Sequence, residues 1–417
     1  MTTATPTRPP EPDAALLEKT VRHLGAMDRP SASPGERDAA FWIAEALRAE
    51  GATVRVERER AHGGYWWPLG LMAGAAGLAG LRRGRGAALA VGAAAAAGIF
   101  DDISGGRLAF RRAVLPHHDT HNVVATLGDP DADQTVLIVA HHDAAHWSLL
   151  FHPGAGEFVG DRWPQLLELS DDTPPVMFPV FGGPLLVALG ALTGRRGVQV
   201  LGAVVSTAVA AVMAEIGSRS TVSGANDNLT GVATLLGVAR TLKEQPVEGL
   251  RIILLSTGSE ESFMEGMQAF ARRHFAALPP ERTHVICVDT VGSPQLLQIE
   301  GEGMIRMREY PAAFKDLVSD VAAERGVSLS RGLRLRNATD GLIALKAGYP
   351  SVMIGSMNEY RLPANYHWPT DVPDNVVYET VADCVRVCDG VVRRLARTLG
   401  RPGPAGAGQP SASTPAA

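Results

Sequence analysis

Cysteine and clustered basic charge are both scarce in this sequence. Only three cysteines occur among 417 residues. Cys287 stands in an apolar run, and Cys384 and Cys388 lie one helical turn apart, which is typical of a helix face and not of a disulfide framework. The formal net charge of -5 is spread along the chain without a basic block. We therefore expect no nucleic-acid partner and no polybasic membrane patch.

The first residues lack a basic segment followed by a continuous apolar run, so no cleavable secretory signal is predicted. Residues 400–417 are rich in Pro, Ala, Gly and Ser, which predicts a disordered tail. The chain as a whole is 46% hydrophobic and 20% charged, a composition that supports a sizeable core. We expect a single domain over residues 13–398.

Apolar residues recur at helical spacing over residues 13–27 and 33–50, where Ser33 and Pro34 are a typical helix start. Short β-rich runs then alternate with helical stretches. The predicted strands cover residues 54–56, 122–127, 136–140, 250–255, 284–288 and 352–354. The predicted helices cover residues 229–243, 263–274, 312–324 and 376–397. This alternation predicts an α/β layer sandwich around a mostly parallel sheet.

Two uncharged stretches interrupt this alternation, and we interpret them as helical hairpins inserted at residues 65–100 and 174–214. An arm of about 17 residues spans roughly 25 Å, a little short of the ~30 Å hydrocarbon core of a bilayer. Buried core helices are the alternative. The pairing of the arms, their small residues and the arginines at both tips favour insertion into the cell membrane. Arginines also flank the hairpins, so the side of the catalytic domain stays open.

Five segments each place an acidic or imidazole side chain where a predicted strand or turn ends, the edge at which an α/β sheet collects functional groups. VLIVAHHDAAH puts His141 and Asp143 on one side of an extended chain, so the carboxylate can orient the imidazole. SGANDNLTG exposes Asp227, which can bridge two cations. LLSTGSEES ends in Glu260 and Glu261, adjacent carboxylates that must point in different directions.

The remaining two segments are VICVDTVGS, which ends in Asp289, and NYHWPTDVPDN, which presents His367 in a loop stiffened by Pro369. The five segments together supply the nitrogen and oxygen ligands that zinc accepts, in addition to a free glutamate. An acidic residue at a strand end is by itself more often a cap or a surface charge. The ordered combination therefore carries the prediction.

The order H-x-D, G-A-N-D-N, E-E, D and Y-H resembles the zinc exopeptidases of the aminopeptidase Y and bacterial leucyl aminopeptidase family, metallopeptidase family twenty-eight. The resemblance covers residues 13–398 apart from the hairpins. It implies a three-layer α/β/α fold around a mostly parallel mixed sheet and a centre of two Zn2+ ions. One zinc would be held by His141 and Asp289 and the other by Glu261 and His367, with Asp227 bridging them.

The resemblance also implies roles for residues beside the metals. Asp143 would fix the tautomer of the His141 imidazole, and Glu260 would be the general base. Tyr366 would donate a hydrogen bond to the developing oxyanion, although packing is an equal alternative. The implied activity is hydrolysis of a peptide or small amide, most simply by an aminopeptidase.

Other functions stay open at this stage. A carboxypeptidase or another amidohydrolase would use the same metal centre, and a glutaminyl cyclase shares the fold but uses one zinc. A non-catalytic membrane scaffold would have lost ligands, whereas here the full set is present. Two positions depart from the family pattern and are expected to touch the substrate pocket: His142, where relatives often carry an aromatic residue, and Asp340-Gly341, where many relatives show Asp-His. Side-chain preference and oligomeric state are not determined by the sequence.

Overall fold

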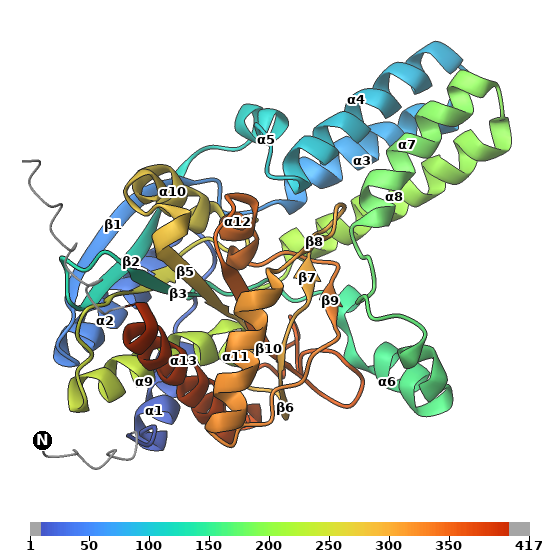
Figure 1. Ribbon diagram of the computed structural model, residues 1–417. Helices are drawn as coiled ribbons and strands as arrows, with labels where there is room; N and C mark the ends of the chain where they lie inside the picture. The colour runs from blue at the N-terminus through green and yellow to red at the C-terminus, as the bar shows by residue number, and fades with distance from the viewer. Residues whose placement is uncertain (1–9, 400–417) are drawn as a thin grey trace, which may run out of the picture.

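The computed structural model describes residues 10–399 and consists of an α/β body from which a helical bundle projects (Figure 1). A seven-stranded sheet forms the middle layer, with the strand order β1-β2-β4-β3-β5-β10-β6. The four central strands β4, β3, β5 and β10 run parallel, while β2 and β6 pair antiparallel with their neighbours. The strands are β1 (Thr53–Ala61), β2 (His118–Gly128), β3 (Thr135–His141), β4 (Arg251–Thr257), β5 (Thr283–Val288), β6 (Gln295–Gln298) and β10 (Ser351–Met357). The predicted mostly parallel mixed sheet is therefore confirmed.

Helices cover both faces of the sheet and make the three-layer sandwich that the resemblance implied. One core cluster joins alternate strand residues such as Ile138 and Leu254 to the helices of the first face. The next residues along the same strands, Val139 and Leu255, belong to the core of the second face. The first face carries α1 (Ala14–Gly25), α2 (Pro34–Ala49), α9 (Thr230–Glu244), α11 (Ala312–Glu324) and α13 (Tyr378–Leu399). The second carries α10 (Glu265–His274), α12 (Asp340–Lys346) and the base of the bundle.

The predicted helix start at Ser33 is confirmed, because its side chain accepts a hydrogen bond from the N–H of Glu36 and Pro34 is the first helical residue. Several short elements were not predicted, because runs of a few residues carry no clear periodicity. These are β6, β7 (Gly301–Glu302), β8 (Arg308–Glu309), β9 (Arg334–Leu335), α5 (Ala109–Val114), α6 (Pro153–Arg162) and α12. The predicted disordered tail lies outside the described residues.

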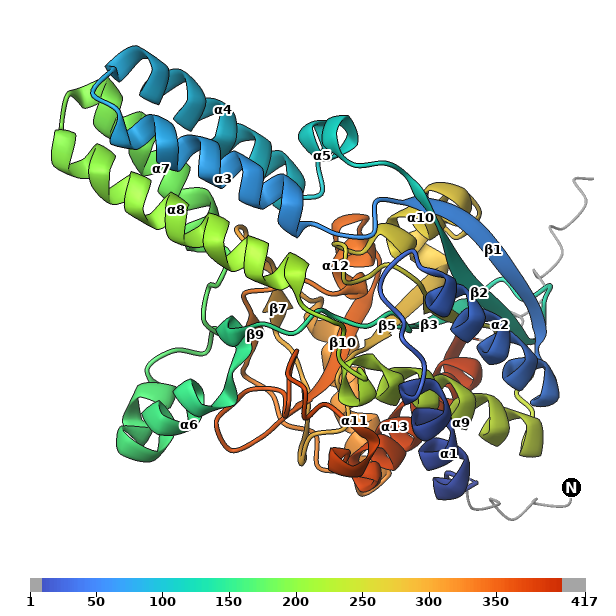
Figure 2. The same ribbon diagram turned by 180° about the vertical axis from the view of Figure 1, so that it is seen from behind.

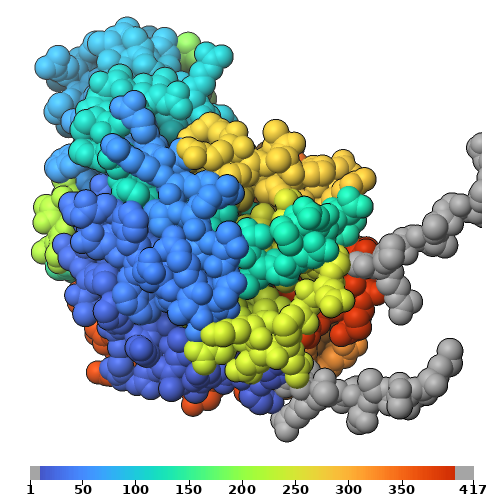
Figure 3. Space-filling model, turned by 90° about the vertical axis from the view of Figure 1, so that its left-hand side faces the viewer, coloured from blue at the N-terminus to red at the C-terminus, as the bar shows by residue number. Residues whose placement is uncertain are grey.

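The two hydrophobic stretches form four helices: α3 (Trp66–Leu81), α4 (Arg85–Ile103), α7 (Phe178–Thr193) and α8 (Arg196–Ser218). They lie side by side as one bundle that points away from the body in both ribbon views (Figures 1 and 2). In the space-filling view from the β1 side, the bundle rises at the top of the body (Figure 3). By length and composition, α4 and α8 could each cross a membrane. Only 39% and 33% of their apolar windows are buried, so most of this apolar surface faces outward.

The two hairpins hold each other together. Within the second hairpin, Gly190 and Gly202 bring α7 and α8 into backbone contact, since a Cβ on either would lie 2.3 and 2.5 Å from a backbone nitrogen of the other helix. Between the hairpins, a Cβ on Gly92 of α4 would lie 2.9 Å from the backbone nitrogen of Ala188 on α7. At the tips, Arg85 donates to the carbonyl of Ala191, and Arg196 donates to the carbonyls that end α3. Arginines from one hairpin therefore satisfy the last carbonyls of the other.

Candidate metal centre

Five predicted ligands meet at the carboxyl ends of the parallel strands. His141 is the last residue of β3, Asp289 follows β5, and Glu261 lies in the loop after β4. Asp227 comes from the turn before α9, and His367 comes from the loop after β10. Since parallel strands present their carboxyl ends at one edge of a sheet, residues spread over more than two hundred positions gather in one place.

The carboxylate of Asp227 lies between the two histidines. Its Oδ1 is 3.1 Å from Nε2 of His141, and its Oδ2 is 3.1 Å from Nε2 of His367. Nε2 of His141 lies 3.8 Å from Asp289, and Nε2 of His367 lies 3.3 Å from Glu261. The donor atoms of His141, Asp227 and Asp289 all lie within 4.8 Å of one another, and so do those of Asp227, Glu261 and His367. The result is two ligand sets that share one carboxylate.

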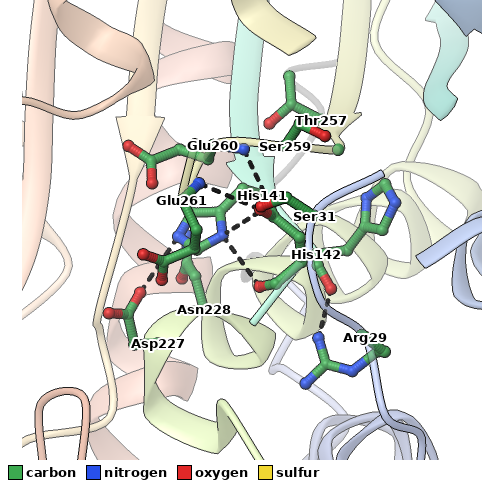
Figure 4. A network of polar contacts seen from close by, with 12 residues as sticks. Arg29, Ser31, His141, His142, Asp227, Asn228, Thr257, Ser259, Glu260 and Glu261 are labelled. Atoms are coloured by element: carbon green, nitrogen blue, oxygen red, sulfur yellow. Dashed lines mark hydrogen bonds and ion pairs between the residues drawn. The ribbon is translucent and has the colours of Figure 1, made fainter. Parts of the chain in front are cut away.

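Glu260 stands beside these sets. Its carboxylate lies within 4.8 Å of the donor atoms of His141 and Glu261. Figure 4 shows the adjacent residues Glu260 and Glu261 as neighbours of His141 and Asp227, which come from two other segments of the chain. The adjacent glutamates point in different directions, as the sequence predicts. Glu261 thus belongs to the set with Asp227 and His367, while Glu260 lies beside His141 and outside the two sets that share Asp227.

Asp143 supports the centre in two ways. Its backbone oxygen and its Oδ1 lie 3.3 and 3.4 Å from Nδ1 of His141, the position expected of a group that orients the imidazole. Its two carboxylate oxygens also accept the backbone N–H groups of Glu260 and Glu261, each at 3.0 Å, and the hydroxyl of Ser31 at 2.6 Å. Asp143 thus fixes both the histidine and the glutamate pair, and only the first contact was predicted.

Asp371 is a supporting residue that the sequence analysis missed. Its carboxylate accepts the backbone N–H groups of Asn226 and Asp227 at 2.6 and 3.2 Å. It is 1% exposed and holds the turn that presents Asp227. The available signal was its place in the segment YHWPTD, four residues after His367.

The electrostatics of the centre show too many buried carboxylates for the positive partners at hand. Burial raises the pKa of Glu260 and of Asp289 well above the usual range, and neighbouring carboxylates add to both shifts. Burial opposes charge on His367, but the carboxylates of Glu261 and Asp227 outweigh it and raise its pKa to about 10. Divalent cations relieve this crowding. The donors are the nitrogen and oxygen ligands that suit zinc, three for each set.

Tyr366 lies against His367, with ring centroids 3.9 Å apart and an interplanar angle of 17°. Its hydroxyl accepts a hydrogen bond from the side-chain nitrogen of Asn337 at 3.1 Å. Burial raises the pKa of this hydroxyl well above its usual value, so it stays protonated and can donate. The geometry suits both the oxyanion role and a packing role.

The expectation that His142 touches the substrate pocket is wrong. His142 is fully buried, and its Nδ1 lies 2.9 Å from the hydroxyl of Ser256 on the neighbouring strand. Burial lowers its pKa to about 3, so it stays neutral. The strand predicted over residues 122–127 begins earlier than expected, because β2 starts at His118 and His121 is a buried strand residue. Asp340 is 2% exposed and bonds to Thr257.

A narrow cleft opens onto the ligand sets. Glu261 and His367 form its floor, and the residues around them are small or apolar for the most part. The remaining lining residues are Ser31, Tyr65, Trp66, Ala144, Ala145, His146 and Ile216. A larger surface hollow that includes Glu50 and Lys243 in its lining contains none of the predicted site residues.

Comparisons with known proteins agree with this fold. The fold resembles an aminopeptidase from Aneurinibacillus sp. strain AM-1, with a TM-score of 0.54 and 15% identity over 92% of this chain and 94% of that one. It also resembles a Zn-dependent exopeptidase from Parabacteroides distasonis, with a TM-score of 0.54 and 14% identity over 93% of this chain and 99% of that one. A third similar structure is a glutaminyl cyclase from Bacteroides thetaiotaomicron, with a TM-score of 0.54 and 15% identity over 93% of this chain and 99% of that one. No curated protein sequence matches the chain.

These structures define the class as the zinc-peptidase fold. Residues 203–392 match Peptidase family M28, a segment that contains Asp227, Glu261, Asp289 and His367. The chain thus contains a segment similar to peptidase family M28, and this match supports a zinc-dependent enzyme of the peptidase class.

Proposed function

We propose that this protein is a co-catalytic two-zinc aminopeptidase anchored in a membrane by its helical bundle. The observation that carries the proposal is the pair of three-residue ligand sets that share Asp227, with Glu260 beside them. Two sets call for two ions. A glutaminyl cyclase, which uses one zinc, would not need the second ligand set.

The residues suggest how hydrolysis would proceed. Bound zinc lowers the pKa of a coordinated water and polarises the substrate carbonyl. Glu260 takes the proton of the attacking water and delivers it to the departing amine, and the buried site favours its protonated form between the two steps. Asp143 keeps Glu260 in place through the backbone N–H. The hydroxyl of Tyr366 is available to donate to the tetrahedral oxyanion.

Preference for a free N-terminus follows from the charges around the cleft. The described residues that line it include no lysine and no arginine, while Glu261 forms part of its floor. The buried cation Arg29 already donates to the carbonyls of Leu24, His142 and Ser223. A substrate ammonium is therefore favoured at this cleft over a terminal carboxylate, which argues for an aminopeptidase over a carboxypeptidase.

The test compares free and N-acetylated aminoacyl reporters on the zinc-loaded protein and on two variants. We expect cleavage of the free reporter only and two zinc ions per chain. Glu260→Gln should keep its zinc and lose on the order of 10²–10⁴-fold in kcat, the range of general acid–base catalysis. Glu244→Gln, an exposed residue at the end of α9, should match the wild type.

Each other outcome identifies another function. Cleavage of blocked substrates alone would indicate a different amidohydrolase. Cyclisation of N-terminal glutamine without peptide cleavage would indicate a glutaminyl cyclase. A folded protein that holds no zinc and cleaves nothing would indicate a scaffold.

Membrane anchoring is supported by the surface of the bundle. The helices carry large apolar side chains that face outward, between arginine-bearing tips and the body. A 23-residue helix such as α8 spans about 35 Å at 1.5 Å per residue, enough for the hydrocarbon core. The exposed apolar residues on these helices are Trp67, Leu71, Leu78, Leu81, Phe100, Phe178, Leu189, Leu192, Leu201 and Val204.

Flotation with lipid vesicles tests the anchoring. The wild type should float with the vesicles and resist a carbonate wash, whereas Leu78→Lys with Leu201→Lys should float less, since a central charge costs about 2.5–3.5 kcal/mol per residue. The matched control replaces Phe41, which is 50% exposed on α2 of the body, by lysine and should float normally. A wild-type chain that stays monomeric in solution without detergent contradicts the anchoring.

A further inference from the structure

The cleft over the metal centre is closed on one side by the helical bundle. Tyr65 and Trp66 stand where α3 begins, and Ile216 stands in the last turn of α8. All three line the same cleft as Glu261 and His367. Residues of both hairpins therefore reach the place where a substrate would lie.

This wall is fixed firmly to the body. The ring of Tyr65 stacks on Phe263, at 4.4 Å between centroids and an angle of 12°, and Phe263 belongs to the loop that carries Glu260 and Glu261. Ile216 is 2% exposed and belongs to the same core cluster as the sheet residues Leu137 and Val139. The bundle base is thus continuous with the body at this point.

Trp66 is held between the two hairpins and the site. Its indole lies over Gly217 so closely that a Cβ there would come within 2.3 Å of its Cδ1. On its other side the ring centroid lies 4.5 Å from that of His146. Trp66 therefore has little room to turn away from the cleft.

The space that remains is small and mostly apolar. Its volume is about 240 Å³ including the opening to solvent. Ala144 and Ala145 line it together with the aromatic rings of Tyr65 and Trp66, so an apolar group of modest size is the one that fits.

We propose that the base of the bundle is the specificity wall of the enzyme and restricts it to substrates whose N-terminal residue has a short apolar side chain, such as alanine. Trp66 and Ile216 set the limit. This inference rests on the proposed aminopeptidase function and names its substrate class. It also assigns the bundle a role in substrate selection in addition to anchoring.

The experiment compares kcat/KM for alanyl, leucyl and phenylalanyl reporters on the zinc-loaded full chain. The wild type should prefer alanyl, and Trp66→Ala should raise the phenylalanyl-to-alanyl ratio tenfold or more, since each methylene that a pocket accommodates changes selectivity by about 10–200-fold. Ile216→Ala, on the other hairpin, should shift the ratio toward leucyl. The matched control Trp67→Ala removes the next side chain, which is 46% exposed, and should leave the ratio unchanged.

A binding measurement separates this inference from the proposed function. Calorimetry with the metal-chelating hydroxamates of alanine and phenylalanine should show tighter binding of the alanine compound to the wild type and a reduced or inverted preference in Trp66→Ala. That result without turnover of any reporter would refute the aminopeptidase and leave the wall intact. Equal affinities, no binding, or a wild-type preference for phenylalanyl would refute the proposal that the base of the bundle sets the specificity.

Discussion

Replacing Arg111 by methionine should destabilise the protein strongly, because Arg111 pairs with a buried carboxylate at the base of the bundle. Its side chain is fully buried, as is that of Asp102, at 0% and 1% exposure. Its Nε donates to Asp102 at 3.1 Å, and its Nη1 donates to the carbonyl of Ser262 at 2.6 Å. Nη1 also lies 3.8 Å from Glu265. The guanidinium thus ties α4 and α5 to the loop that carries Glu260 and Glu261.

The expected cost is about 3–5 kcal/mol at pH 7, the range for removing one partner of a buried ion pair. Glu265 keeps hydrogen bonds from His62 and Ser262, so most of the cost falls on Asp102. Burial already raises the pKa of Asp102 although Arg111 opposes the shift. Without Arg111 the pKa of Asp102 rises further. An acid whose pKa is higher in the folded protein than in the unfolded chain makes the fold less stable as pH rises above the pKa of the unfolded chain. The destabilisation should therefore be smaller at pH 5 than at pH 8.

Urea unfolding in mild detergent measures this difference, with Arg112→Met as the matched control because Arg112 is the exposed neighbour. The double variant of Arg111→Met with Asp102→Leu should recover part of the loss, since an apolar pair of similar volume leaves no unpaired charge. The reasoning fails if Arg111→Met is as stable as Arg112→Met, or if its deficit does not depend on pH.

Three shorter predictions concern the metal centre and the acid stability of the body. Asp371→Asn should weaken zinc binding by about 10–100-fold, because it supports the turn of Asp227 without touching a metal, and a chelator competition measures this. Removal of zinc should lower the thermal midpoint, and zinc at 100 times its Kd should restore about 2.7 kcal/mol; an unchanged midpoint would count against a built site. Hydrogen bonds from Arg331 lower the pKa of Glu300 to about 2 although burial opposes them. The contribution of Glu300 to the free energy of unfolding is therefore fully present above about pH 4.5 and fades as pH falls toward 2. Glu300→Gln should therefore lose its stability deficit over that pH interval, and a deficit that persists at pH 2 would refute this contribution.

Much of the body followed from local patterns. The strands that deliver His141 and Asp289 are continuous apolar runs, because a central parallel strand is buried on both faces. The helix periodicity of residues 312–324 coincides with α11. Successive side chains of a strand point to opposite faces. The alternation that places His141 and Asp143 on one side therefore places His142 on the other, away from the site. The sequence contained that information.

Other features depend on contacts between distant segments. Nothing local relates Asp371 to the turn at Asp227, or Arg111 to the loop after β4, since their contacts span 144 and 151 positions. The pairing of α3 with α8 likewise joins two separate hairpins and places Trp66 against Gly217.

The sequence by itself determined the layers of the body and the identity of the residues at the sheet edge, because burial imposes a period of two on strands and about 3.6 on helices. Only the tertiary structure decided how the hairpins pair, which carboxylates support the ligands and which side chains wall the cleft. Those contacts depend on shape and charge complementarity between segments far apart along the chain, and no local periodicity encodes them.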